Sequence, residues 1–87
     1  MEKPDVAPGE WIYVNGVSSV VCQIFKTTPP DIEVVFMDKG KAVNKDAKWD
    51  RDRWVFASND LGGYADDYQR LARFVAILRQ GRQFHKE

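Results

Sequence analysis

The sequence predicts a mainly β protein: a small five-stranded antiparallel barrel followed by one C-terminal α-helix. Apolar and polar side chains alternate over several short segments, as expected of strands. Asn15-Gly16 lies between two of these segments and supplies the positive φ angles of a tight hairpin turn. From Asp66 onward the apolar period changes from two residues to three or four, which is typical of an amphipathic helix.

The first two predicted strands are joined by the Asn-Gly turn. The segment 10–14 alternates, with Ile12 and Val14 on one face. The segment 17–26 has apolar residues on both faces, so we expect neighbouring structure to cover both sides of it. Residues 1–9 hold two prolines and a glycine and are expected to form a flexible lead-in.

Prolines, glycines and charged turns separate the remaining strands. Thr28-Pro29-Pro30-Asp31 ends the second strand, because proline cannot donate a hydrogen bond to a β ladder. The segment 32–38 is the third strand, the mostly polar segment 42–49 suits a short exposed strand, and 54–56 is the last. The barrel therefore occupies residues 10–57, and its short connections favour a small barrel over a sandwich.

The predicted helix covers residues 66–80, after a loop at 58–65. Asp66 and Gln69 form a capping-box-like start, and Gly81 is expected to follow the helix as its C′ residue. We place the apolar stripe of this helix across one open end or face of the barrel; the stripe consists of Tyr68, Leu71, Phe74, Val75 and Leu78. A tail at 81–87 completes a single domain of residues 1–87.

Composition limits the classes of function. The 87 residues are 44% apolar and 30% charged, as in an ordinary folded domain, and the formal net charge is zero. A neutral chain has no general attraction to nucleic acid or membranes. Its single cysteine excludes an internal disulfide, and the sequence shows neither a signal peptide nor an apolar stretch near the roughly 20 residues of a membrane helix. We expect a cytoplasmic protein without a membrane segment.

Charge is divided unevenly along the chain. Residues 1–67 hold 8 Lys/Arg and 12 Asp/Glu, a net charge of −4, whereas residues 68–87 have a net charge of +4. One interpretation is a helix whose cations lie toward its C-terminus, where the macrodipole favours them. The other is a basic contact surface for an acidic partner, formed by Arg70, Arg73, Arg79 and Arg82.

The sequence contains no set of residues that indicates catalysis or metal binding. Cys22 is flanked by valines in a predicted strand, and we interpret it as a small buried hydrophobe rather than a nucleophile. His85 is the only histidine, and one Cys with one His is too few for a zinc cluster. Asp46, Asp50 and Asp52 alternate with cations, as on a solvated hairpin tip. We expect no metal and no cofactor.

Aromatic side chains are the candidate binding residues. Small barrels use such side chains to stack on proline helices, methylated amines or bases. The alternative is that they fill the interior of a barrel with few leucines. The candidates lie near predicted strand ends or turns, where not all of them can be core: Trp11, Tyr13, Trp49, Trp54 and Tyr64.

Part of the chain resembles a Src-homology-3-like small barrel. The resemblance is carried by EWIYVNG, VVCQIF, DIEVVFMDKGKAVNKDAKW and RWVFAS, and the tail GGYAD…RLARFVAILRQGR adds a helix that those barrels often lack. With this helix the whole chain is similar to small proteins carried on the mobile gene cassettes of bacterial integrons. Those proteins largely lack assigned activities, so the resemblance implies a fold and a bacterial source but no functional residues.

The sequence favours a non-catalytic module that binds a protein or peptide through aromatic residues of the barrel surface. Two alternatives remain open: nucleic-acid binding through the basic C-terminal helix, and a small enzyme whose site forms at an oligomer interface.

We also expect a homodimer, since one helix can cover only one face of the sheet. An edge strand at 32–38, or an outward row of Val21, Phe25, Val35 and Met37, would then need a second copy as cover. A closed barrel is the competing answer, because closure removes the edges.

Overall fold

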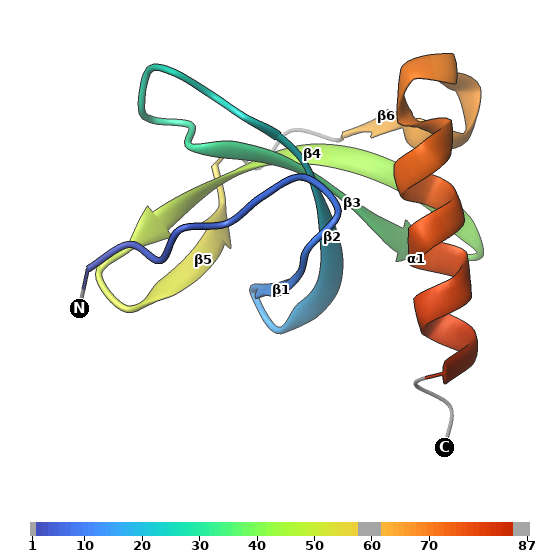
Figure 1. The fold of residues 1–87 in the computed structure, drawn as a ribbon, viewed down its shortest axis with the longest axis horizontal. Coiled ribbons are helices and arrows are strands. Elements are labelled where there is room, and N and C mark those ends of the chain that lie inside the picture. Colours follow the sequence, from blue (N-terminus) through green and yellow to red (C-terminus); the bar gives the residue numbers. More distant parts are fainter. Residues whose placement is uncertain (1, 58–61, 85–87) are drawn as a thin grey trace.

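The chain folds as a small β-barrel with one α-helix against its outer side (Figure 1). The computed structural model describes residues 2–57 and 62–84. The predicted mainly β fold with a small barrel and one C-terminal helix is confirmed. Its elements are β1 (Trp11–Val14), β2 (Val17–Ile24), β3 (Ile32–Asp38), β4 (Lys41–Asp50), β5 (Arg53–Phe56), β6 (Gly63–Tyr64), the 3₁₀ turns η1 (Ala65–Asp67) and η2 (Gln69–Leu71), and α1 (Ala72–Phe84).

The barrel closes through a pairing that differs from the purely antiparallel prediction. The strand order is β3-β2-β1-β5-β4, and β3 also pairs with β4. Strands that follow each other in the chain are antiparallel, but β1 and β5 meet in parallel at Val14 and Trp54. After four reversals of direction β1 and β5 point the same way, so the pair that closes a five-stranded meander must be parallel. The barrel is therefore mixed.

Two hairpin turns have matching backbone geometry: the predicted Asn15-Gly16 turn and the turn between β3 and β4. Asn15 and Gly16 have φ angles of 51° and 77°, and Lys39 and Gly40 have 53° and 83°. Positive φ at both central residues is the type I′ geometry, whose twist matches that of the flanking strands. These turns set the register between β1 and β2 and between β3 and β4.

The strand β4 is longer and more buried than its polar sequence indicates. It spans 10 residues, and Ala42, Val43 and Ala47 are buried. The prediction of a short exposed strand was wrong because these small side chains are separated by lysines and aspartates that dominate the pattern. At Val43 and Asn44 this strand also pairs with β6, which the sequence did not predict.

Apolar side chains form a core on each side of the sheet. The interior cluster fills the barrel and the outer cluster lies under the helix, and β2 and β3 contribute to both, as expected for strands covered on two sides. The interior cluster consists of Val14, Val21, Ile32, Val34, Ala47 and Trp54. The outer cluster consists of Val20, Cys22, Val35, Ala42, Ala65, Leu71, Val75 and Leu78.

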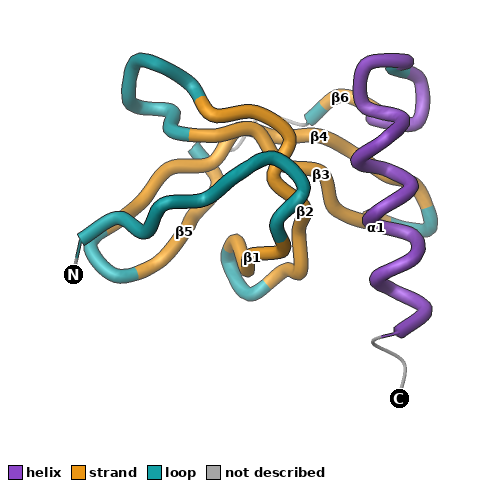
Figure 2. Tube along the Cα trace, viewed as in Figure 1, coloured by secondary structure: helices purple, strands orange, loops and turns teal. Residues whose placement is uncertain are grey.

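The helix begins later than predicted. Its α-helical part starts at Ala72, after η1 and η2, and it packs along β2 and β3 on the outer side of the sheet (Figure 2). Asp66 makes no cap; its carboxylate accepts a hydrogen bond from the backbone N–H of Ala42 at 2.9 Å. Tyr68 is exposed rather than part of the buried stripe, because it lies between the two 3₁₀ turns and not on the helix.

Gly81 lies inside α1 and does not end it, which corrects the C′ prediction. Trp11 of β1 is the reason for a glycine here: a Cβ atom at Gly81 would lie 1.9 Å from Trp11 Cζ2. Only a residue without a side chain allows the helix and the indole ring to approach this closely. The predicted loop residues 58–61 and tail residues 85–87 lie outside the described residues.

The lead-in, which the sequence predicts to be flexible, contacts the barrel at three points. Val6 packs against the interior cluster, and the N–H of Gly9 donates to the carbonyl of Val21 at 2.8 Å. Lys3 forms an ion pair with Asp31 at 3.1 Å. Residues of the lead-in can therefore take part in a site on the barrel.

The structure removes both reasons for expecting a homodimer. The strand β3 is not an edge, because it pairs with β2 and with β4. In the predicted outward row, Val21 and Val35 are fully buried and Phe25 and Met37 are half-buried. The homodimer stays a prediction. Light scattering at micromolar concentrations tests it, and the mass of one chain at every concentration would contradict it.

Candidate functional site

Three of the five predicted aromatic residues belong wholly or partly to the core. Trp11 is partly buried against the outer cluster, and its ring lies against Gly81 of the helix. Trp54 is buried in the barrel interior, where Trp49 meets it edge to face with ring centroids 5.2 Å apart. Trp49 is only half-buried and reaches the surface. Trp54 therefore fills the barrel, which was the alternative interpretation of the aromatic residues.

The other two aromatic residues are exposed but lie apart. Tyr13 is 66% exposed on β1 and Tyr64 is 54% exposed on β6, and these strands are not neighbours in the sheet. The ammonium of Lys41 lies 5.2 Å from the centre of the Tyr64 ring. Tyr64, Lys41, Asp66 and Asp67 line a pocket of about 260 Å³. The aromatic set is thus divided among the core and separate parts of the surface.

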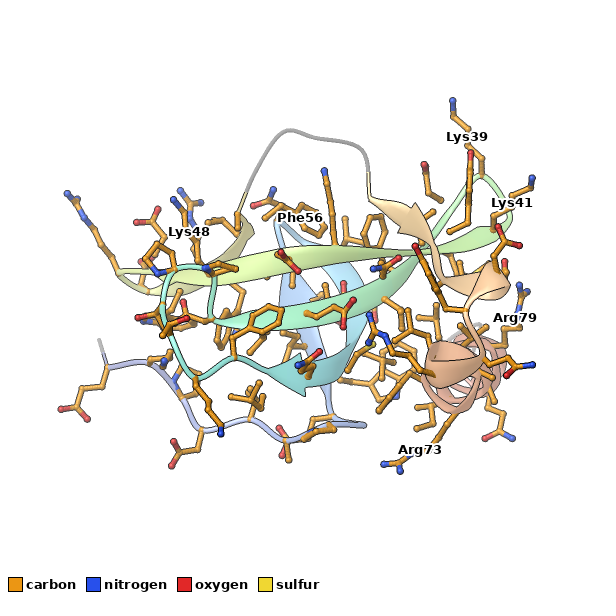
Figure 3. All side chains as sticks on the ribbon, turned by 90° about the horizontal axis from the view of Figure 1, so that it is seen from above. Lys39, Lys41, Lys48, Phe56, Arg73 and Arg79 are labelled. Atoms are coloured by element: carbon orange, nitrogen blue, oxygen red, sulfur yellow. The ribbon has the colours of Figure 1, made fainter. Side chains whose placement is uncertain are left out.

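The predicted basic surface is also divided. Arg70 forms an ion pair with Glu33 and Arg79 one with Asp66. Arg73 lies 5.0 Å from the ring centre of Phe74, and the side chain of Arg82 lies outside the described residues. Figure 3, which looks along the helix, shows Arg73 and Arg79 on different sides of it.

Asp66 and Arg79 also link the helix to β4. The N–H of Ala42 first, and then Arg79, holds the pKa of Asp66 below its usual range. Two of the candidate arginines are therefore engaged with carboxylates of the same chain.

A buried carboxylate that was not predicted from the sequence lies beside η2. Glu33 is 4% exposed and accepts hydrogen bonds from Arg70 and from the Asn44 side chain at 2.9 Å. Burial first, and then the charge of Glu33, raises the pKa of the Cys22 thiol to about 12. Such a thiol is a poor nucleophile, in agreement with the prediction of a buried hydrophobe. Burial and Glu33 also raise the pKa of Asp46.

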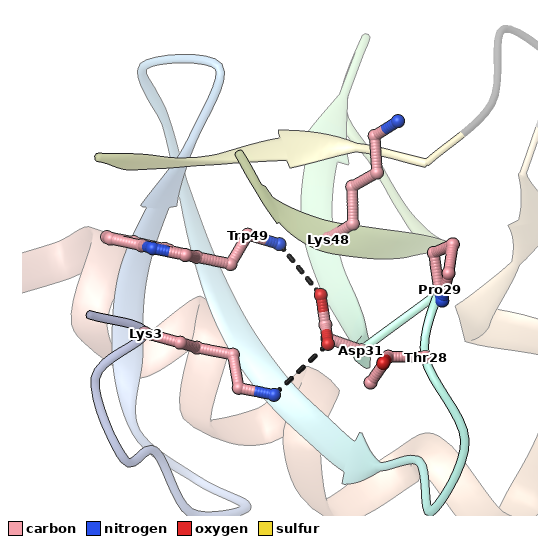
Figure 4. A pocket seen from close by; sticks show the side chains of 6 residues that line it. All are labelled: Lys3, Thr28, Pro29, Asp31, Lys48 and Trp49. Carbon is pink, nitrogen blue, oxygen red and sulfur yellow. Dashed lines mark hydrogen bonds and ion pairs between the residues drawn. The ribbon is translucent and has the colours of Figure 1, made fainter. Parts of the chain in front are cut away.

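A surface pocket forms where the lead-in, the β2–β3 connection and the end of β4 converge (Figure 4). Its volume is about 310 Å³. We call it the Asp31 pocket; it is lined by Lys3, Thr28, Pro29, Asp31, Lys48 and Trp49. Only Trp49 among these belongs to the predicted site residues.

Hydrogen bonds of its backbone and of its side chain hold Asp31 in this pocket. Its N–H donates to the carbonyl of Ala47 and its carbonyl accepts from the N–H of Phe25, each at 2.9 Å. Its carboxylate accepts from the backbone N–H of Trp49 at 2.8 Å and from the Lys3 ammonium at 3.1 Å. Figure 4 shows both interactions converging on the one carboxylate. Backbone pairing on both sides thus sets the place of this side chain.

The pocket favours a negatively charged ligand. Its lining residues Lys3, Lys48 and Asp31 sum to a formal charge of +1, and the Thr28 hydroxyl adds a neutral donor. Only the Lys3 ammonium contacts Asp31; Figure 4 shows the Lys48 side chain leading away from this carboxylate, so its charge acts from the rim. Pro29 and the half-buried Trp49 ring supply apolar contact area beside these donors. Chemically, the arrangement can hold a carboxylate that is attached to an apolar group.

The sequence carried only a weak signal for this pocket. Asp31 follows two prolines and directly precedes a strand, which is a common setting for a turn residue. Its cationic partner Lys3 is distant in sequence, and no local pattern joins the two. Glu33 carried a better signal, because it shares a strand face with Val35 and a charge there needs a partner.

Comparison with known proteins gives no match to a family model, to a curated protein or to a solved structure. Within residues 2–57 and 62–84 no helix has the length and apolar character needed to span a bilayer. The same residues contain no group of three or more His, Cys, Asp or Glu side chains placed to hold a metal ion.

Proposed function

We propose that the protein is a non-catalytic binding module that takes an acidic group of a partner protein or peptide into the Asp31 pocket. The observation that carries this proposal is the ion pair of Asp31 with Lys3. It holds an ammonium group at a pocket that Lys48 and Trp49 also line. A held cation binds an anion at a smaller entropy cost than a freely moving surface lysine does.

The size and lining of the pocket indicate a peptide as the ligand. A volume of about 310 Å³ lies at the lower end of the range for ligand pockets and suits one or two side chains. A glutamate or aspartate side chain can accept hydrogen bonds from Lys3 and Thr28, and the charge of Lys48 at the rim adds a longer-range attraction. A neighbouring apolar residue of the same peptide can pack on Trp49 and Pro29.

A peptide is a better partner for this chain than nucleic acid. Arg70 and Arg79 already pair with Glu33 and Asp66, which leaves less positive charge on the helix for phosphates. The two lysines of the Asp31 pocket lie beside an aspartate, an arrangement that suits one carboxylate better than a run of phosphates.

We further propose that the chain is a Src-homology-3-like barrel of the kind carried on bacterial integron gene cassettes, acting in the cytoplasm. The small barrel with a C-terminal helix supports the fold part of this proposal. Finding the coding sequence between integron recombination sites would test its origin.

Titration of the ¹⁵N-labelled protein tests the binding function. The probe is the peptide acetyl-Gly-Glu-Leu-amide, and its uncharged analogue acetyl-Gly-Gln-Leu-amide is the control. We expect the amide signals of Asp31 and Trp49 to shift with the glutamate peptide, and to shift less as salt screens the interaction. Equal shifts with both peptides, or none with either, would contradict the proposal.

Two variants locate the interaction. Lys48→Gln is expected to weaken binding of the glutamate peptide several-fold, because it removes one of the two pocket cations. Arg73→Gln is the matched control, since Arg73 lies on the helix and contacts Phe74. A loss of binding in Arg73→Gln, with none in Lys48→Gln, would assign the anion site to the helix instead.

A further inference from the structure

We infer that Asp31 is a positioning residue for anion binding: it holds Lys3 at the pocket. The inference rests on the proposed function and deepens it, because it names the group that makes the Asp31 pocket selective for an anion. The negative charge of Asp31 then favours anion binding, which is the opposite of what charge counting predicts.

The exposure of the two side chains supports these roles. The Asp31 side chain is 9% exposed and the Lys3 side chain 47% exposed, so solvent and a ligand reach the lysine more easily than the aspartate. One carboxylate oxygen of Asp31 is taken by the N–H of Trp49 and the other by Lys3. An ammonium group has three N–H donors, and Asp31 takes one of them.

The placement of Lys3 depends on Asp31. Lys3 belongs to the lead-in, 28 residues from Asp31 in sequence, and the contacts of Val6 and Gly9 hold the lead-in further along the chain. A lysine side chain loses much rotamer freedom when its head is fixed. The ion pair with Asp31 supplies this ordering before a ligand arrives, so the ligand does not have to.

The substitution Asp31→Asn separates positioning from net charge. An asparagine keeps an oxygen that can accept from the N–H of Trp49, but it removes the anion that pairs with Lys3. The formal charge of the pocket rises from +1 to +2 when one anion is removed from two cations and one anion. Charge counting therefore predicts tighter binding of a carboxylate, whereas positioning predicts weaker binding because Lys3 is released.

The experiment measures binding of acetyl-Gly-Glu-Leu-amide to full-length Asp31→Asn, Lys3→Gln and the double variant by NMR titration. We expect each single variant to weaken binding about two- to fivefold, the range of a partly exposed charge pair. The double variant should bind no more weakly than Lys3→Gln alone, because the two residues act as one unit. Lys3→Arg should retain most of the binding, since a guanidinium can also pair with Asp31.

The outcomes distinguish this inference from the proposed function. If the wild type binds the glutamate peptide but Asp31→Asn binds it more tightly, or if the two losses multiply, positioning is wrong and the binding function stands. If the wild type does not distinguish the glutamate from the glutamine peptide, both fail. Should Asp31→Asn not fold, the comparison of Lys3→Arg with Lys3→Gln decides, and equal losses in both would overturn positioning.

Discussion

Arg70 donates hydrogen bonds from both terminal nitrogens of its guanidinium group to the two carboxylate oxygens of Glu33, each across 2.9 Å. Arg70 lies in η2 and Glu33 in β3, so this pair fastens the segment before α1 to the barrel. Glu33 is buried and Arg70 is largely exposed, hence the carboxylate is the partner that depends on the pair. Hydrogen bonding to Glu33 in turn raises the pKa of Arg70.

Removing this arginine should destabilise the fold. Arg70→Ala leaves Glu33 buried without its cation, and we expect the free energy of unfolding to fall by about 1–3 kcal/mol. Urea denaturation measures the loss. Arg73→Ala is the control and should cost less than about 0.5 kcal/mol, because Arg73 is exposed on the helix. Equal stabilities of the two variants would show that the Glu33 pair contributes nothing.

Gly81→Ala should destabilise the protein although alanine is the better helix former. Helix propensity alone predicts a gain of about 0.5–1 kcal/mol. The added methyl group would overlap the Trp11 ring, and we expect overpacking to cost about 1–3 kcal/mol instead. Thermal denaturation decides the sign. A raised melting temperature would mean that the helix and Trp11 are not in contact in solution.

The cost of truncating an apolar residue of α1 should increase with the depth at which its side chain is buried. Leu78 is buried in the outer cluster, and Leu78→Ala is expected to cost about 2–5 kcal/mol of unfolding free energy. Phe74 is only partly buried at the edge of this cluster, so Phe74→Ala should cost less than Leu78→Ala despite the larger side chain. The reverse order in urea denaturation would mean that Phe74 is buried more deeply against the sheet than Leu78.

The Cys22 thiol should make stability fall at alkaline pH. Its pKa is about 12 in the folded protein against 9.0 in the unfolded chain. Below pH 9 the thiol is neutral in both states and its contribution to the free energy of unfolding is fully present. As the pH rises from about 9 toward 12, the thiol ionises in the unfolded chain but not in the folded protein, and this contribution is lost. Urea denaturation measures the free energy of unfolding at pH 7 and at pH 10. Its decrease between these pH values should be smaller in Cys22→Ala than in the wild type, because the two proteins differ in no other titrating group. An identical decrease would mean that Cys22 is accessible in the native state.

Local patterns predicted the barrel better than they predicted its surroundings. Asn15-Gly16 and the alternation beside it require only neighbouring residues, so the first hairpin could be predicted. The start of α1 could not, because Asp66 binds the N–H of Ala42 in β4 instead of capping the helix. Gly81 was likewise interpreted as a helix end, because the contact that requires a glycine there is with Trp11, at the other end of the sequence.

The candidate site was harder to predict than the fold, because no single segment contains it. Trp49 was selected as an aromatic residue near a turn, which gave no information on its neighbours. Lys3 and Asp31 come together only after the lead-in lies along the barrel. An aspartate after two prolines, such as Asp31, is also what an ordinary exposed turn contains, so the sequence does not indicate that Asp31 is buried.

The parallel contact of β1 with β5 predicts an order in which the barrel folds. It consists of the register pair of Val14 with Trp54 and a hydrogen bond from the N–H of Asn15 to the carbonyl of Trp54 at 3.1 Å. Every other pair of neighbouring barrel strands is joined by a short connection and closes at a small entropy cost. The contact between β1 and β5 spans the whole meander, so we expect it to form after the hairpins and to open before them. In hydrogen exchange the amide of Asn15 therefore reports the opening of the barrel, while the amides within the β3–β4 hairpin report the loss of the fold as a whole.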